Sequence, residues 1–203
     1  MTRSLPVVAV VGRPNVGKST LVNRIVGART AIVEEQPGVT RDRKELTASW
    51  GARDFVVVDT GGWLPPSAAA EDPAVLVRRV SEQAERAIAD SDVVICVVDA
   101  TVGLLEEDDA VARVLRRAGK PVIVAVNKVD DGGREPDAWQ FTRLGLGSPH
   151  AISAGHGRGT GDLLDAIVAA LPEPGGVAAA EPDAFAVAIV GRPNVGKSTL
   201  FNR

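Results

Sequence analysis

The sequence predicts an α/β protein in which helices cover both faces of a mostly parallel β-sheet. Short apolar runs rich in β-branched residues recur along the chain, and the segments between them repeat apolar residues with the period of a helix. Continuous apolar runs are typical of strands buried on both faces, as parallel strands are. The composition, with 45% hydrophobic and 24% charged residues, is that of a globular protein with one core.

The predicted strands are of two kinds. In residues 45–50 apolar and polar side chains alternate, which indicates a strand with one exposed face at the edge of the sheet. Gly51 and Ala52 then turn the chain back into the next run, so we expect an antiparallel hairpin here. The runs expected to form buried strands are Val7–Val11, Phe55–Val58, Val93–Val98 and Val122–Val126.

Helices are predicted where apolar residues recur on one face. In one of them an acidic run at 106–109 comes first and Gly119 follows the last residue, an order that suits the helix dipole and its C-terminal stop. We expect Trp139 and Phe141 to pack under a shorter helix. The predicted helices cover residues 76–88, 106–118, a segment starting near Glu135 and Pro136, and 160–171.

Composition excludes several classes of protein. The apolar runs are far shorter than the roughly 18 residues of a membrane span, and the N-terminus has no secretory signal pattern. The single cysteine, Cys96, fits a reducing compartment, and we expect a cytoplasmic protein. A net charge of −3 gives no electrostatic footprint for nucleic acid. His150 and His156 are isolated from each other and from any carboxylate cluster, so no metal site is expected at them.

The stretch GRPNVGKST at residues 12–20 follows a predicted strand and opens a helix, which is the context of a phosphate-binding loop. Its glycines let successive backbone N–H groups point at phosphate oxygens. Lys18 is expected to reach the β- and γ-phosphates, and the Ser19 hydroxyl to ligate Mg²⁺. The alternative is a glycine turn with an unrelated lysine. The expected contacts are Gly12, Arg13, Pro14, Asn15, Val16, Gly17, Lys18, Ser19 and Thr20.

A second motif, Asn127-Lys128-Val129-Asp130, follows the last long buried strand, at the edge of the sheet where ligands gather. The Asp130 carboxylate can accept hydrogen bonds from N1–H and the 2-amino group of guanine, and adenine lacks both donors. A pocket built for such donors rejects an analogue without them by ~10⁴-fold. The predicted ligand is therefore GTP or GDP and not ATP, and the alternative is a surface turn.

With both motifs in hand, the remaining ones resemble those of the Era-type GTPases. PGVTRD at 37–42 is similar to the first switch, DTGG at 59–62 to the second, and Ser153-Ala154 to the loop that touches guanine. More specifically, GRPNVGKST, PGVTRDR, DTGGW and the second GRPNVGKST at 191–199 resemble the motifs of the Der (EngA) family, bacterial GTPases with two such domains in series. The resemblance implies a Ras/Era-like P-loop NTPase fold with a six-stranded sheet and one antiparallel edge strand.

The resemblance also implies roles at the switches. Thr40 would coordinate Mg²⁺ and sense the γ-phosphate, Asp59 would hold Mg²⁺ through water, and the Gly62 N–H would bind the γ-phosphate. Neighbours Thr60, Gly61 and Trp63 are expected at the nucleotide. Trp63 stands where Ras-like proteins carry a water-orienting glutamine, so intrinsic hydrolysis should be slow. Asn15 matches the asparagine through which this subgroup often binds a monovalent cation, so potassium-stimulated hydrolysis is expected, with a loop-capping amide as the alternative.

We expect a first GTPase domain at 1–171, a linker at 172–185 and the truncated start of a second domain at 186–203, whose Lys197 and Ser198 should not hold nucleotide here. The alternative is that residues 186–203 form a functional miniature repeat. The predicted function is hydrolysis of GTP, and we expect a monomer. The resemblance implies a role in assembly of the large ribosomal subunit, with most contacts to the subunit made by residues outside this chain. A guanine-nucleotide-binding module with negligible hydrolysis is the alternative, and a small-molecule P-loop kinase is a weaker one.

Overall fold

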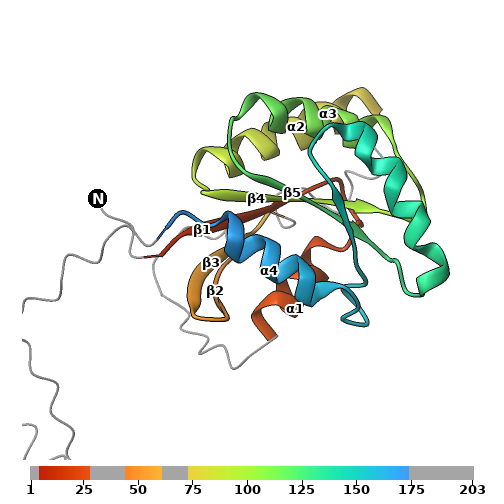
Figure 1. Cartoon of the computed structure of the whole chain (residues 1–203). Coiled ribbons are helices and arrows are strands. Elements are labelled where there is room, and N and C mark those ends of the chain that lie inside the picture. The colour runs from red at the N-terminus through yellow and green to blue at the C-terminus, as the bar shows by residue number, and fades with distance from the viewer. Residues whose placement is uncertain (1–4, 28–43, 61–72, 174–203) are drawn as a thin grey trace, which may run out of the picture. The chain divides into compact units, whose positions relative to one another are not determined.

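Six strands form one sheet in the order β2-β3-β1-β4-β5-β6 in the computed structural model of the chain (Figure 1). The structure describes residues 5–27, 44–60 and 73–173. All neighbouring strands run parallel except β2 and β3, which form the predicted antiparallel hairpin at one edge. The strands are β1 (Val7–Val11), β2 (Lys44–Trp50), β3 (Arg53–Asp59), β4 (Val93–Asp99), β5 (Val122–Asn127) and β6 (Pro149–Ala151).

Helices lie on both faces of this sheet, as the α/β fold class predicts (Figure 1). Helices α1 and α4 pack on one face and α2 and α3 on the other. The helices are α1 (Lys18–Gly27), α2 (Pro73–Ala89), α3 (Glu106–Arg117), the 3₁₀ helix η3 (Gly132–Leu144) and α4 (Thr160–Ala170). Among the described residues, no helix combines the length and the apolar character that crossing a membrane requires.

The core consists of two apolar layers separated by the sheet. Successive residues of β1 alternate between them: Val8 and Val10 belong to the layer under α1 and α4, and Ala9 and Val11 to the layer under α2 and α3. Every residue of β4 is buried. The continuous apolar runs of the sequence are therefore strands covered on both sides, as predicted.

The segment after β5 differs from its prediction. It forms a 3₁₀ helix that begins at Gly132, and its buried side chains are Ala138, Phe141 and Leu144. These three are spaced by three residues, which is the period of a 3₁₀ helix, so they share one face. Trp139 falls on another face and is 62% exposed, so the prediction that it packs under the helix is wrong.

The chain divides into two compact units, residues 1–172 and 173–203. The first contains every strand and helix given above. Most of the predicted linker and the whole second GRPNVGKST lie outside the described residues.

Candidate functional site

The parallel strands end at a common edge of the sheet, and the residues of the sequence motifs lie at these strand ends or just after them. Gly12 comes directly after β1, Asp59 ends β3, Asp99 ends β4, Asn127 ends β5, and Ser153 follows β6. Residues from 12 to 153 are thereby gathered at one end of the domain. In open α/β sheets this edge is where ligands bind.

Two glycines allow the 12–20 loop to lie against the sheet. Gly12 has a φ of 147°, and a Cβ placed on it would lie 2.3 Å from the carbonyl oxygen of Val97. Gly17 has a φ of 95°, and its Cβ would lie 2.3 Å from Nδ2 of Asn127. Neither position has room for a side chain, so both glycines are required by close approach as well as by backbone conformation.

The Lys18 side chain folds back over its own loop. Its Nζ donates hydrogen bonds to the carbonyl oxygens of Gly12 at 2.8 Å and Arg13 at 2.7 Å, and the residue is 6% exposed. Burial lowers the pKa of Lys18 to about 8; repulsion from Arg13 adds to this, and attraction by Asp59 opposes it. A buried ammonium with a lowered pKa gains from any anion brought to the loop.

Asn127 joins three segments of the site. Its Nδ2 donates to the carbonyl oxygen of Val16 at 2.8 Å, and its Oδ1 accepts from the backbone N–H of Ala154 at 2.9 Å. The residue is 3% exposed. One buried amide therefore holds the phosphate loop and the Ser153-Ala154 segment at a set spacing.

Lys128 adds a second and more exposed link between the end of β5 and the phosphate loop. It has a φ of 68°, and its Nζ lies 2.6 Å from Oδ2 of Asp99 and donates to the carbonyl oxygen of Asn15 at 3.0 Å. Burial would raise the pKa of Asp99, but hydrogen bonds from Lys128 and Thr101 outweigh it and hold that pKa below its ordinary value. The ends of β4 and β5 are thus tied to the phosphate loop by an ion pair as well as by the Asn127 amide.

Asp130 has its carboxylate at the surface beside the Ser153 loop. Ser153 Oγ donates to Oδ1 of Asp130 at 2.7 Å, and Nδ1 of His156 lies 3.2 Å from the same oxygen. The hydrogen bond from Ser153 is the main cause that lowers the pKa of Asp130, with a smaller contribution from His156. His156 thus contacts one carboxylate that is 26 positions away in sequence, because the pairing of β6 with β5 brings the two loops together.

Oxygen donors suited to magnesium lie beside the phosphate loop. Ser19 is exposed at the start of α1, and Asp59, 8% exposed, attracts the Lys18 ammonium. Hydroxyl and carboxylate oxygens are ligands that Mg²⁺ prefers. In the described part of the chain, no three His, Cys, Asp or Glu side chains converge on one possible metal position. The remaining predicted switch residues, Thr40, Gly61, Gly62 and Trp63, lie outside the described residues.

The other residues predicted to contact the nucleotide differ in how far they are buried. Val16, Val129 and Ala154 are buried and contribute backbone and packing. Thr60 is buried, and its hydroxyl donates to the carbonyl oxygen of Val10 at 2.6 Å, so it anchors the end of β3 to β1. Partly or fully exposed loop positions are Pro14, Asn15 and Thr20, and Asn15 has a φ of 64°.

Arg13 makes a contact that the motif did not reveal. Its Nε lies 3.3 Å from Oδ1 of Asp108, which is buried at the start of α3 and accepts a hydrogen bond from the Leu105 N–H through Oδ2. Burial raises the pKa of Asp108 to about 6, although Arg13 acts against this rise. Within the described residues, Nε and Nη2 of Arg13 have no well-aligned hydrogen-bond acceptor. The acidic run at 106–109 was the only sequence signal for this pair.

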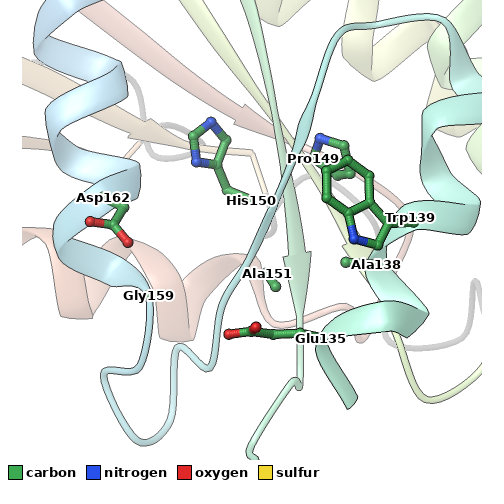
Figure 2. Close-up of a pocket in the computed structure, with 8 residues that line it drawn as sticks. All are labelled: Glu135, Ala138, Trp139, Pro149, His150, Ala151, Gly159 and Asp162. Atoms are coloured by element: carbon green, nitrogen blue, oxygen red, sulfur yellow. The ribbon is translucent and has the colours of Figure 1, made fainter. Parts of the chain in front are cut away.

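A pocket of about 250 Å³ lies apart from these residues, between η3, β6 and α4 (Figure 2). Figure 2 shows the lining residues, among them Glu135 from η3, His150 from β6 and Asp162 from α4. None of the predicted site residues is among those that line it: Glu135, Ala138, Trp139, Pro149, His150, Ala151, Gly159 and Asp162.

Known proteins match most of the length of this chain. The family described as "50S ribosome-binding GTPase" matches residues 7–128 and 186–203. The chain is 58% identical over 198 residues to GTPase Der of Mycobacterium tuberculosis, and 54% identical over 203 residues to GTPase Der of Streptomyces coelicolor. Both alignments cover 98% of this chain and 42% of the relative, so the chain spans less than half the length of these curated relatives. A crystal structure of Aquifex aeolicus Era bound to GDP and AlF₄⁻ superposes with a TM-score of 0.63 at 30% identity, over 84% of this chain and 58% of that one.

Proposed function

The chain belongs to the family of 50S ribosome-binding GTPases, and from that premise we propose that its first domain is a switch that binds GTP and hydrolyses it to GDP and phosphate. The observation that carries the proposal is the position of Asn127. One buried amide bonds the carbonyl of Val16 in the phosphate loop and the N–H of Ala154 in the loop that meets Asp130 through Ser153. A ligand with phosphates at one end and a base at the other matches two loops joined in this way.

At the phosphate end, Lys18 exchanges its two carbonyl acceptors for β- and γ-phosphate oxygens. The exchange is favourable because burial disfavours the ammonium in the empty loop, and an adjacent anion removes that penalty. Backbone N–H groups at the start of α1 add donors and the positive end of the helix dipole.

At the base end, the Asp130 carboxylate accepts the N1–H and 2-amino hydrogens of guanine. The lowered pKa of Asp130 supports this role, because the carboxylate stays ionised at neutral pH and so acts only as an acceptor. Adenine presents an acceptor where guanine presents N1–H, so the same carboxylate repels it.

Ser19 and Asp59 would hold Mg²⁺ together with Thr40 and the nucleotide phosphates. A magnesium ion held there would supply positive charge beside the phosphates. We further propose that Asn15, an exposed residue of the phosphate loop, contributes to a potassium site that stimulates hydrolysis, as the resemblance of this loop to that of the Era-type GTPases implies. Gly62 would bind the γ-phosphate, and Trp63 in place of a glutamine makes the intrinsic rate slow.

The output that we propose is action on the large ribosomal subunit. Its support is the description of the matching family, whose match also includes residues 186–203 and so favours a second domain that begins there. Contacts with the subunit would come mostly from parts of a longer protein, because the curated relatives are more than twice as long as the matched region.

Nucleotide titration tests the binding step. Isothermal titration of the chain with GDP, GTP, ADP and ATP in Mg²⁺ should give a strong preference for guanine over adenine. Asp130→Ala should remove most of that preference, whereas Asp131→Ala, an exposed neighbour, should keep it. Equal affinity for GDP and ADP would end the assignment.

Single-turnover hydrolysis tests the chemical step. We expect slow release of phosphate from GTP, faster in KCl than in NaCl, and loss of the salt difference in Asn15→Ala. Tight guanine binding with no hydrolysis in either salt, with or without large ribosomal subunits, would favour a binding module instead of a GTPase.

A further inference from the structure

The carboxylate of Asp130 is already engaged by two neighbours. Oδ1 accepts from Ser153 Oγ at 2.7 Å, and His156 Nδ1 lies 3.2 Å from Oδ1 and 3.0 Å from Ser153 Oγ. An ionised carboxylate can only accept hydrogen bonds, and the Ser153 hydroxyl has used its single hydrogen on Asp130. Nδ1 of His156 therefore carries a proton in this arrangement, whether the ring is neutral or charged.

Entry of a base must disturb this cluster. A carboxylate oxygen offers about two lone-pair sites, and Oδ1 already faces two donors. Two parallel N–H donors of a base span both carboxylate oxygens, so one of the present donors has to leave Oδ1. Ser153 is 1% exposed and held by the loop, whereas the His156 side chain is 71% exposed and makes the longer contact. The ring is the group that can swing away.

We propose that His156 is a positioning residue of the guanine site that occupies Asp130 while the site is empty and leaves when guanine binds, so that protonation of its ring weakens guanine nucleotide binding. The proposal rests on the proposed role of Asp130 in base recognition. Protonation turns the Nδ1–H contact into an ion pair, which the entering base must break. An exposed ion pair changes an equilibrium constant by about two- to five-fold.

The charges around the ring leave Asp130 as its ionic partner. On neighbouring elements, Arg24 of α1 donates to the carbonyls of Ala154 and Gly155, Arg134 of η3 pairs with Asp137, and Arg158 pairs with Glu135. Each of these cations contacts another acceptor, and Arg134 in addition makes a small contribution to the lowered pKa of Asp130. The pKa of Asp130 lies below its ordinary value, so this carboxylate stays charged while histidine rings titrate between pH 5 and 8.

The first test compares GDP affinity of the wild-type chain and His156→Gln from pH 5.5 to 8. The phosphates of GDP also titrate near pH ~6, but they do so equally for both proteins. The ratio of dissociation constants, wild type over variant, should therefore rise by about two- to five-fold on acidification. His150→Gln removes the other of the two histidines and should keep the wild-type pH dependence.

The second test reads the ring itself by NMR. With two histidines in the chain, His150→Gln assigns the remaining Cε1–H signal to His156. Linkage is reciprocal, so GDP should lower the titration midpoint of this signal by about 0.3 to 0.7 pH units, the same two- to five-fold factor. An unchanged or raised midpoint, or a ratio of dissociation constants that does not vary with pH, would overturn the proposal. Equal binding of GDP and ADP at pH 8 would instead be a failure of the proposed function.

Discussion

The side-chain amide of Asn127 donates a hydrogen bond to the carbonyl oxygen of Val16 at 2.8 Å, across 111 positions of sequence. This bond joins the end of β5 to the loop after β1, although β4 lies between these strands in the sheet. Asn127, part of the motif predicted to bind the base, therefore also holds the phosphate loop in position. The position of each of these two loops depends on the other.

Replacing Asn127 by Ala should weaken both stability and nucleotide binding. The change leaves the carbonyl of Val16 and the N–H of Ala154 without partners, and two unsatisfied buried groups cost about 2 to 4 kcal/mol. Urea unfolding monitored by circular dichroism measures the loss, and titration with GDP measures affinity. Gln140→Ala is the control, because this exposed amide donates to the carbonyl oxygen of Asp137 within η3. Stability of Asn127→Ala equal to that of the control would contradict the bridging role.

Gly17→Ala should disable the phosphate loop. The new Cβ would lie 2.3 Å from Asn127 Nδ2 at a φ of 95°, so the loop must shift and the bond from Asn127 to Val16 must stretch. We expect GDP affinity at least about ten-fold lower, in line with a strained backbone costing about 1 to 3 kcal/mol. Gly161→Ala in α4 is the matched control, since its Cβ meets nothing within 4 Å and alanine suits a helix. If both variants bind GDP alike, the loop is not confined as described.

Nucleotide binding should take up a proton above neutral pH. The pKa of Lys18 is lowered to about 8 in the empty loop, and phosphate charge beside it should raise that pKa. A group whose pKa rises on binding takes up protons, so uptake should approach about half a proton at pH 8, and affinity should fall as pH increases through this range.

Calorimetry in buffers of different ionisation enthalpy measures this uptake. Lys120→Arg serves as a control on another loop, where Lys120 donates to the carbonyls of Ile88 and Ser91 at the end of α2, and should keep it. Binding without proton uptake at pH 8 would mean that the Lys18 ammonium is not the group that meets the phosphates.

Asp108→Ala should destabilise the domain even though it removes a buried charge. Arg13 would lose its counter-ion, and the Leu105 N–H would lose its acceptor, so we expect a loss of about 3 kcal/mol in the free energy of unfolding. Asp109→Ala, at an exposed neighbour, should change it by less than about 0.5 kcal/mol.

The double variant Arg13→Met, Asp108→Leu tests whether the loss of stability in Asp108→Ala comes from the unpaired charge of Arg13. Removing both buried charges together is often neutral or stabilising, so its stability should lie well above that of Asp108→Ala. A double variant as unstable as the single one would show that packing, and not the unpaired arginine, accounts for the loss.

Much of the fold followed from local patterns. The buried runs became parallel strands because each is apolar on both faces, and the alternation at 45–50 became the antiparallel edge strand. The helix after β5 was harder, because only its start near Glu135 and Pro136 was predicted and no period was assigned to it. Ala138, Phe141 and Leu144 follow the period of a 3₁₀ helix, which buries Phe141 as predicted and leaves Trp139 exposed.

The sequence by itself determined the residue types that chemistry requires at close spacing: a glycine-rich loop with Lys18 after one strand and a lone carboxylate, Asp130, after another. Tertiary structure alone decided which groups far apart in sequence come into contact: Asn127 with Val16, His156 with Asp130 and Asp108 with Arg13. The physical reason is that local patterns reflect periodicity and backbone conformation along the chain, whereas these contacts depend on how strands order and align across the sheet, which no short stretch of sequence encodes.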